Sequence, residues 1–414
     1  MSKFSSVKKI SGLFITQGIA ALAAIVVGKL TAMYVNPSIL GEYNLQYGFY
    51  AFFFSALITP CIQSFKSNIP TEGGAQEESK EYVVFYIGIL SALLQIPFLA
   101  FILLSFKYIN ISVGLLLIML GAGLSQAWFS LLRDLLNIRH QHKIYGIISI
   151  VNTMANLLVF VLMYYFIGNM SSFSLWGVLL VTNFLTVTIT FRYIRLDLSY
   201  FKFLTKEKIL IYSKQLLYYT KPLLLLSVFA WINNYADRYI LSYFYSTEQV
   251  GYYSVGYGLG SKISLLNTPF LLFLTPKILE IVREKRDNSL IHTVIKKTLL
   301  PYLAIGSFAC LFLFLEYEWV GNIFLDRQFE PGFKIIPIIG FSFFMLTTAY
   351  LLETKFYAKG TTKYILWHNI VGGVFNIILN ILMIPHFGIL GAAWATLISF
   401  TIQLLCVIWL YYKY

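Results

Sequence analysis

Residues 144–167 read IYGIISIVNTMANLLVFVLMYYFI, an uncharged apolar run that is long enough to cross a lipid bilayer. A membrane-spanning helix needs about 20 such residues. Similar runs recur along the whole chain of 414 residues, 58% of which are hydrophobic and 12% charged, and we count twelve. The core of a soluble domain of this length could not bury twelve long apolar runs, so we predict an all-α membrane protein. The predicted spans are 10–34, 42–65, 82–105, 112–133, 144–167, 173–193, 221–245, 250–275, 298–318, 335–354, 364–384 and 388–412.

The basic residues predict how the spans are oriented. If the N-terminus is cytoplasmic, 25 of the 31 lysines and arginines fall in cytoplasmic segments. Only Lys107, Arg327 and Lys334 fall in segments on the external side of the membrane, and the remaining three, Lys29, Arg238 and Lys262, fall within spans. Because cytoplasmic loops of membrane proteins are enriched in Lys and Arg, both termini are predicted to be cytoplasmic. The net charge of +13 is then mainly a topology signal, which argues against a nucleic-acid partner.

Part of the chain repeats at a fixed offset. Ile150–Asn156 (IVNTMAN) resembles Ile370–Asn376 (IVGGVFN), and further along Gly168 matches Gly388. The offset is 220 residues throughout, without a gap. We therefore predict that the first six and the last six spans are two copies of one unit.

A second match, with a smaller offset, supports the repeat. Leu40–Tyr43 (LGEY) resembles Val250–Tyr253 (VGYY), just after the first and the seventh span. An even number of spans per copy predicts two lobes related by a pseudo-twofold axis along the membrane normal, an arrangement typical of transporters. The predicted domains are a six-helix lobe at 1–197, a basic cytoplasmic linker at 198–220 and a second six-helix lobe at 221–414.

Four charged residues lie deepest within the predicted spans, namely Lys29, Asp237, Arg238 and Lys262. A charge at that depth is costly unless it faces a wet cavity or a partner. We expect Lys29, Arg238 and Lys262 to face one cavity between the lobes, and its excess of positive charge suits an anionic substrate. Asp237 and Arg238 lie about 100° apart on a helix, so we do not expect them to pair. Two alternatives stay open: Lys29 and Arg238 snorkel to the interface, or these charges join the lobes.

Five amide side chains are assigned to the same substrate cavity: Gln17, Asn233, Asn234, Asn376 and Asn380. Asn376 and Asn380 lie one turn apart on the same helix face. For these two the alternative is hydrogen bonding between helices, which we favour.

The remaining chemically reactive residues predict neither an active site nor a metal site. His368 and His386 lie at predicted span ends, so we expect them to be interfacial and not proton relays. Cys61, Cys310 and Cys406 lie in or beside spans without paired spacing, as expected for packing residues. There is no phosphate-binding loop, no zinc-ligand spacing and no nucleophile motif, so we predict a transporter without catalytic residues.

Several segments resemble the polysaccharide-transporter branch of the multidrug/oligosaccharidyl-lipid/polysaccharide exporter superfamily, the Wzx-type O-antigen flippases. Asn36–Tyr43 (NPSILGEY) resembles a Gly-Pro-x-x-x-Gly-x-Tyr turn of that family, although many members have Gly where this chain has Asn36. Asn233–Leu241 (NNYADRYIL) with Val250–Val255 (VGYYSV) resembles the signature of its seventh span. Asn376–Ala393 (NIILNILMIPHFGILGAA) is the most specific match.

The resemblance implies a two-lobed bundle of twelve helices in the bacterial cytoplasmic membrane. It implies a flippase that moves an undecaprenyl-diphosphate-linked oligosaccharide, a repeat unit of O-antigen or a related surface polysaccharide, to the outer leaflet by alternating access. Lys29, Arg238 and Lys262 would then neutralise the diphosphate, Asp237 would line the same cavity, and the amides would accommodate the sugar. No cofactor is implied beyond coupling to a proton or sodium gradient. A polysaccharide polymerase and a chain-length regulator are the implied functional partners.

Three other functions remain as alternatives. A multidrug transporter of the same superfamily handles cations, which fits poorly with three basic residues and one acidic residue within the spans. A lipid II or lipid III flippase also has a cationic cavity; Val27–Leu30 and Glu284–Asp287 resemble segments of the lipid III flippase, whereas the two extra helices usual in lipid II flippases are not seen. A polysaccharide polymerase or ligase usually carries a large external loop, which this sequence lacks.

Overall fold

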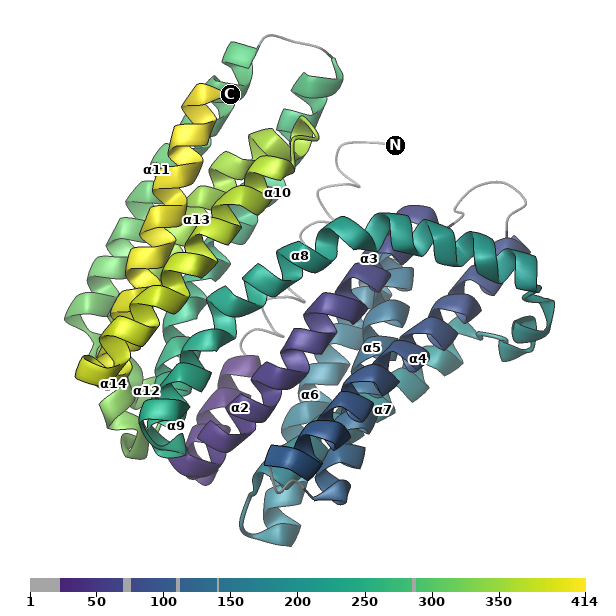
Figure 1. Cartoon of the computed structure of the whole chain (residues 1–414), viewed down its shortest axis with the longest axis horizontal. Helices are drawn as coiled ribbons and strands as arrows, with labels where there is room; N and C mark the ends of the chain where they lie inside the picture. The colour runs from purple at the N-terminus through teal and green to yellow at the C-terminus, as the bar shows by residue number, and fades with distance from the viewer. Residues whose placement is uncertain (1–22, 70–75, 109–111, 140, 285–287) are drawn as a thin grey trace. The chain divides into compact units, whose positions relative to one another are not determined.

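The computed structural model describes residues 23–69, 76–108, 112–139, 141–284 and 288–414, except for the side chains of 76–78, 97–108, 222 and 288. Apart from short turns, these residues are helical, and none of them forms a strand (Figure 1). The helices are α2 (Pro37–Phe53), α3 (Thr59–Asn68), α4 (Gln76–Tyr108), α5 (Val113–Ile138), α6 (His142–Ile167), α7 (Ser172–Ile194), α8 (Lys206–Phe244), α9 (Thr247–Gly260), α10 (Asn267–Arg283), α11 (Asn288–Leu315), α12 (Tyr317–Phe324), α13 (Ile336–Ala358) and α14 (Lys363–Lys413).

The described residues contain nine helical stretches that are long and apolar enough to cross a membrane, or ten if the bent α8 is one span. α14 holds two predicted spans, because Gly388 has φ 55° and turns the chain between them. The short helix Ala23–Tyr34 is the described part of the first predicted span. Each of the twelve predicted spans therefore has a helical counterpart, and the all-α membrane fold is confirmed.

Short irregular helical turns join several of the long helices into continuous spans. A π-helical turn at Phe54–Ile58 joins α2 to α3, just before Pro60, which has no N–H to donate to the helix. The turn Ser261–Leu266 joins α9 to α10, and Arg327–Ile335 leads into α13. The single predicted spans 42–65 and 250–275 are thus each built from three helical pieces, whereas the predicted span 335–354 is almost entirely α13.

The chain forms two compact units, which we call unit 1 and unit 2. Unit 1 contains the described residues up to Val35 and Gln46–Val228, and unit 2 contains Asn36–Leu45 and Phe229–Tyr414. The division falls within α8, and the first turns of α2 belong to unit 2. The domain boundaries predicted from the sequence at 197 and 221 stay a prediction.

In unit 1, α5 packs against α4, α6 and α7 (Figure 1). Its core combines aliphatic and aromatic side chains of α3, α4 and α5 with Tyr212 and Leu216 of α8. Two hydrogen bonds join polar side chains within unit 1: the Tyr86 hydroxyl donates to Ser64 Oγ at 2.9 Å, and Trp176 Nε1 donates to Gln46 Oε1 at 2.8 Å. Such pairing offsets the cost of burying polar atoms.

In unit 2, α13 packs against α10, α11 and α14, with a core of buried residues from all four helices (Figure 1). The start of α2 crosses the start of α9 very closely. A Cβ added at Gly41 would lie 1.8 Å from Thr247 O, and one added at Gly251 would lie 2.0 Å from Pro37 O. Glycine at both positions is therefore required by the close approach of the two backbones. These are the glycines that the LGEY and VGYY segments share.

Candidate functional site

Arg238 of α8 is the most enclosed basic side chain of the predicted site. The residue is 5% exposed and lies against α9. Its Nε donates to Ser254 Oγ at 3.3 Å, and its Nη1 donates to Asn234 O and to Asp237 Oδ1, the latter at 3.2 Å. Nη2 donates no hydrogen bond within the described residues. The guanidinium is thus held at two of its three nitrogens.

Aromatic rings surround the same guanidinium. Its central carbon lies 4.5 Å from the ring centre of Tyr257, 5.2 Å from that of Tyr235 and 5.7 Å from that of Tyr253. Tyr253 and Tyr257 are one turn apart on α9, so both rings face α8. A cation over an aromatic face is attracted by the quadrupole of the ring. The three tyrosines therefore stabilise a buried positive charge and fix its position.

Asp237 supplies the opposite charge and is 1% exposed. Its Oδ1 accepts the backbone N–H of Arg238 at 2.8 Å, and its Oδ2 accepts the Tyr253 hydroxyl at 2.5 Å. The expectation that Asp237 and Arg238 do not pair is wrong. The 100° step separates only the Cβ directions of neighbouring residues, whereas the long Arg238 side chain bends back along α8 toward Asn234 and meets Asp237 there.

The structure does not bring every predicted residue to this cluster. Lys262 lies in the turn after α9, where its side chain is exposed, and it makes no contact with the cluster. Lys29 is half-buried in the short helix Ala23–Tyr34 of unit 1. Gln17 lies outside the described residues. A shared cavity for Lys29, Arg238 and Lys262 stays a prediction.

The predicted asparagines fall into two groups. Asn234 accepts the Tyr257 hydroxyl at 3.5 Å and so belongs to the Arg238 cluster, and Asn233, one residue earlier, is 4% exposed. Asn376 donates to Ser399 Oγ at 3.0 Å, and Asn380 donates to Asn376 Oδ1 at 2.9 Å. Hydrogen bonding across the two halves of α14, the alternative favoured from the sequence, is therefore what the structure shows for this pair. Whether either group contacts substrate stays a prediction.

A second buried ion pair, which was not predicted from the sequence, joins α13 and α14. Glu353 of α13 is 2% exposed and His368 of α14 is 0% exposed. Glu353 Oε1 and His368 Nε2 are 2.8 Å apart. The His368 ring is therefore directed into unit 2, and the expectation that this residue lies at the membrane interface stays a prediction. The signal was present in the sequence, since Glu353 is the one charged residue in the predicted span 335–354.

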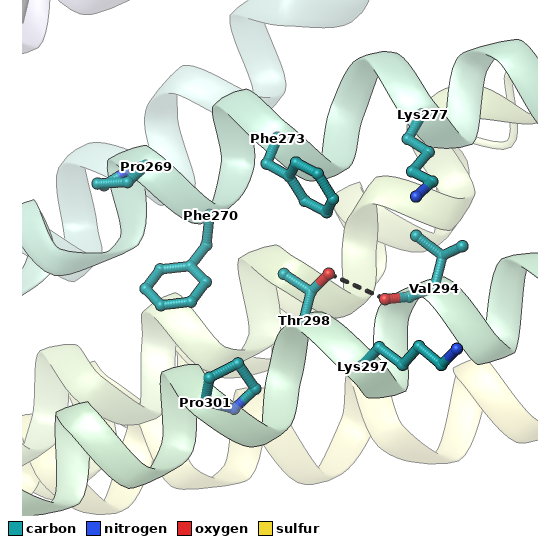
Figure 2. Close-up of a pocket in the computed structure, with 8 residues that line it drawn as sticks. All are labelled: Pro269, Phe270, Phe273, Lys277, Val294, Lys297, Thr298 and Pro301. Carbon is teal, nitrogen blue, oxygen red and sulfur yellow. Dashed lines mark hydrogen bonds between the residues drawn. The ribbon is translucent and has the colours of Figure 1, made fainter.

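A separate cleft of about 420 Å³ lies between α10 and α11. Figure 2 shows Phe270 and Phe273 on one wall and Pro301 on the other, with Lys277 and Lys297 at one end. Thr298 is turned to its own helix, where its hydroxyl donates to Val294 O at 2.9 Å (Figure 2). The cleft contains none of the predicted site residues.

Known structures share this fold. An inward-facing multidrug resistance transporter of the MATE family and the MOP superfamily matches with a TM-score of 0.74 and 13% identity, covering 98% of this chain and 97% of that one. The lipid II flippase MurJ in an inward closed conformation matches with a TM-score of 0.70 and 15% identity, covering 97% of this chain and 87% of that one. The chain is thus a multi-pass membrane protein with the fold of MOP-superfamily transporters.

Sequence comparison adds one relative. The probable low-salt glycan biosynthesis flippase Agl15 of Haloferax volcanii is 22% identical over 193 residues, which are 46% of this chain and 40% of the relative. The match thus spans less than half of that protein. No family model matches the chain.

Proposed function

We propose that this chain is a flippase of the Wzx-type polysaccharide branch, which carries an undecaprenyl-diphosphate-linked oligosaccharide to the outer leaflet by alternating access. The fold supports a transporter. MurJ and Agl15, whose names describe flippases for lipid II and for glycan biosynthesis, are similar to it in structure and in sequence, respectively. The substrate would be a repeat unit of O-antigen or of a related surface polysaccharide.

The observation that supports this proposal most directly is the buried Arg238 guanidinium, which neighbouring side chains hold in place. A guanidinium can donate to a phosphate oxygen from one nitrogen while the protein holds its other two nitrogens, which an ammonium with a single nitrogen cannot do. Asp237 and the tyrosines fix the guanidinium before any ligand binds, so little side-chain entropy is lost on binding. Nη2 is the donor left for the diphosphate. Lys29 and Lys262 would add positive charge as the lipid-linked substrate enters.

The test is complementation of a flippase-null strain, with surface glycan read on a gel and protein amount checked by blot. Arg238→Ala should abolish surface polysaccharide, and Arg238→Lys should restore part of it because the charge remains while the planar group held by Ser254, Asn234 and Asp237 is lost. Lys29→Ala should have the same effect, more mildly. Lys334→Gln removes an exposed cation of unit 2 and serves as the matched control. Full activity of an Arg238→Ala, Lys29→Ala double variant at normal expression would refute the electrostatic mechanism.

A multidrug transporter is the second candidate, because the MATE structure has the same fold. Purified full-length protein in vesicles separates the two. A flippase should move a fluorescent undecaprenyl-diphosphate oligosaccharide to the opposite leaflet and should not be inhibited by a lipophilic cationic drug. Export of the drug without movement of the lipid would favour the second candidate.

The chain would lie in the bacterial cytoplasmic membrane with both termini in the cytoplasm, use a proton or sodium gradient, and work beside a polymerase and a chain-length regulator. Single cysteines introduced in 198–220, in a variant without Cys61, Cys310 and Cys406, should react with an impermeant reagent only from the cytoplasmic side.

A further inference from the structure

Glu353 and His368 form a buried acid–imidazole pair that the proposed substrate site does not use. They lie on consecutive helices, with Glu353 five residues before the end of α13 and His368 five residues after the start of α14. Both side chains are almost completely buried, and Oε1 and Nε2 are 2.8 Å apart. Ionisable side chains buried in membrane helices are costly, and in transporters they mark ion or proton pathways.

The surroundings of the pair contain few other charges. Tyr350 and Tyr357, one turn before and one turn after Glu353 on α13, are the titratable groups that interact with its carboxylate. From α14, the Asn369 amide lies 3.4 Å from His368 Nε2. No charged residue among the described parts of α9, α10, α11 and α12 lies at ion-pair distance from the pair.

The nearest basic residue on α13 is turned elsewhere. Lys355 Nζ donates to Tyr411 O at 2.8 Å and lies 4.5 Å from the centre of the Tyr411 ring. His292 of α11 contacts the same ring, and Lys359 interacts with both Lys355 and His292. Lys355 and His292 therefore lie at Tyr411 and not at the Glu353–His368 pair. Within the described residues, Glu353 and His368 have no ion-pair partner other than each other.

A row of unpartnered polar atoms begins at this pair. His368 Nδ1 is buried and has no hydrogen-bond partner. Gln403, in the second half of α14, is 0% exposed, and neither its amide oxygen nor its amide nitrogen has a partner. Its side chain lies over Gly372, one turn after His368, where an added Cβ would be 1.9 Å from Nε2 of the glutamine. Buried polar atoms without protein partners are typically satisfied by water.

We propose that Glu353 and His368 form a proton-binding site, and that water held at Gln403 connects this site along the Gly372 face of α14 toward Asn376. Loading and unloading of this proton would couple a proton gradient to transport, and that coupling rests on the proposed function. Asn376 and Ser399 continue the row, with 3.0 Å between Asn376 Nδ2 and Ser399 Oγ.

The charge balance of the pair supports a single exchangeable proton. With one proton, the pair is either a carboxylate with an imidazolium or a carboxylic acid with a neutral imidazole, and its net charge is zero. Loss of that proton to water leaves the carboxylate and a neutral imidazole with a net charge of −1. Gain of a second proton leaves the acid and the imidazolium with a net charge of +1. A low-dielectric interior disfavours both charged forms, so proton release requires water to enter.

Infrared difference spectra of the full-length protein in lipid nanodiscs, recorded between acidic and alkaline buffer, test proton binding directly. The wild type should show a protonated-carboxyl band that is lost in Glu353→Gln and whose midpoint pH moves in His368→Asn. His386→Asn is the matched control, because His386 lies on the same helix with an exposed side chain, and it should leave the band unchanged. Gln403→Leu should slow deuterium exchange of the band by about tenfold or more, equivalent to about 1.4 kcal/mol of barrier.

Spectra of Glu353→Gln identical to wild type, or an unmoved midpoint in a correctly folded His368→Asn, would overturn the proposal. Gel filtration identifies variants that do not fold. If Glu353→Gln does not fold, Glu353→Asp is used in its place. This variant keeps a carboxyl group and should shift the position of the infrared band. In vesicles with a labelled undecaprenyl-diphosphate oligosaccharide, the transport rate of wild type should rise with a pH gradient, and that of Glu353→Gln should not. Absence of lipid movement in wild type would refute the proposed function, whereas the infrared result would still decide the proton site.

Discussion

Two positions that correspond in the two copies of the repeat carry different side chains with different hydrogen bonding. In unit 1, the Asn152 amide of α6 donates to Asn183 Oδ1 at 3.3 Å on α7, and Asn183 donates to Gln126 Oε1 at 2.7 Å. An offset of 220 residues places Gly372 and Gln403 at the corresponding positions of unit 2. Gly372 has no side-chain amide. The Gln403 side chain occupies the space beside Gly372, and its amide atoms have no hydrogen-bond partner. The missing side chain at position 372 therefore leaves the Gln403 amide without the partner that Asn183 has in unit 1.

The copies also differ in buried charge. Both ion pairs that are almost fully buried among the described residues, Asp237–Arg238 and Glu353–His368, lie in unit 2. In unit 1 the recorded ion pairs, Lys66–Asp134 and Lys208–Glu81, have lysines that are at least one-third exposed. A buried charge depends on its partner far more than an exposed charge does. Loss of a single charged side chain should therefore destabilise unit 2 more than unit 1.

The largest expected effect concerns Arg238. Arg238→Gln should lower the free energy of unfolding by about 3–5 kcal/mol, because the buried Asp237 carboxylate loses its partner. The double variant Asp237→Asn, Arg238→Gln should lose much less. SDS titration of the purified protein in mixed micelles measures both. Equal losses in the single and double variants would show that the charges are not coupled and would remove the contrast between the units.

The next effect tests the Gly372 position. Gly372→Asn should cost about 1–3 kcal/mol of stability, because its Cβ would overlap Gln403 in a packed interior. Gly372→Asn with Gln403→Asn copies the pair found in unit 1 and should recover most of that loss. Gly258→Ala, at a glycine with nothing within 4 Å of an added Cβ, is the control. Failure of the double variant to recover stability would mean that the two positions are not equivalent in the two copies.

A pair of glycines tests the repeat at its turns. Gly168 has φ 77° at the end of α6, and Gly388 has φ 55° at the matching place in α14. Gly168→Ala and Gly388→Ala should each cost about 1–3 kcal/mol, because ψ is −54° at Gly168 and −132° at Gly388, and an L-residue is strained where φ is positive and ψ is negative. An added Cβ meets nothing within 4 Å at Gly168 and only ordinary contacts with Tyr245 at Gly388. A large difference between the two losses, measured by thermal unfolding in detergent, would argue against equivalent turns.

The smallest expected effect is that of Asn152→Ala. It removes two hydrogen bonds, to Asn183 at 3.3 Å and to Thr186 at 3.1 Å. Hydrogen bonds between membrane helices contribute about 0.6 kcal/mol each on average, and Asn183 keeps its bond to Gln126. A loss of about 1 kcal/mol is expected by SDS titration. A loss as large as that of Gly372→Asn would show that unit 1 depends on this network more than its geometry indicates.

Much of the fold could be predicted from the sequence. Runs of apolar residues must be helical in a membrane because lipid cannot satisfy backbone hydrogen bonds, and this places the helices without knowledge of their packing. The repeat was visible for a similar reason: Gly41 and Gly251, like Gly168 and Gly388, occupy positions where the backbone itself needs glycine. Local constraints of this kind leave a direct record in the sequence.

Side-chain partners were decided by tertiary structure alone. The sequence selected Arg238 and Asp237 by depth, but their pairing depends on Tyr253 and Tyr257 of α9, which hold the guanidinium against α8. Lys262, chosen by the same rule, is exposed. Glu353 and His368 lie near predicted span ends, and only the packing of α13 on α14 buries them together. The sequence determined which segments cross the membrane because that depends on summed local hydrophobicity, whereas the direction of each charge depends on long-range contacts between helices.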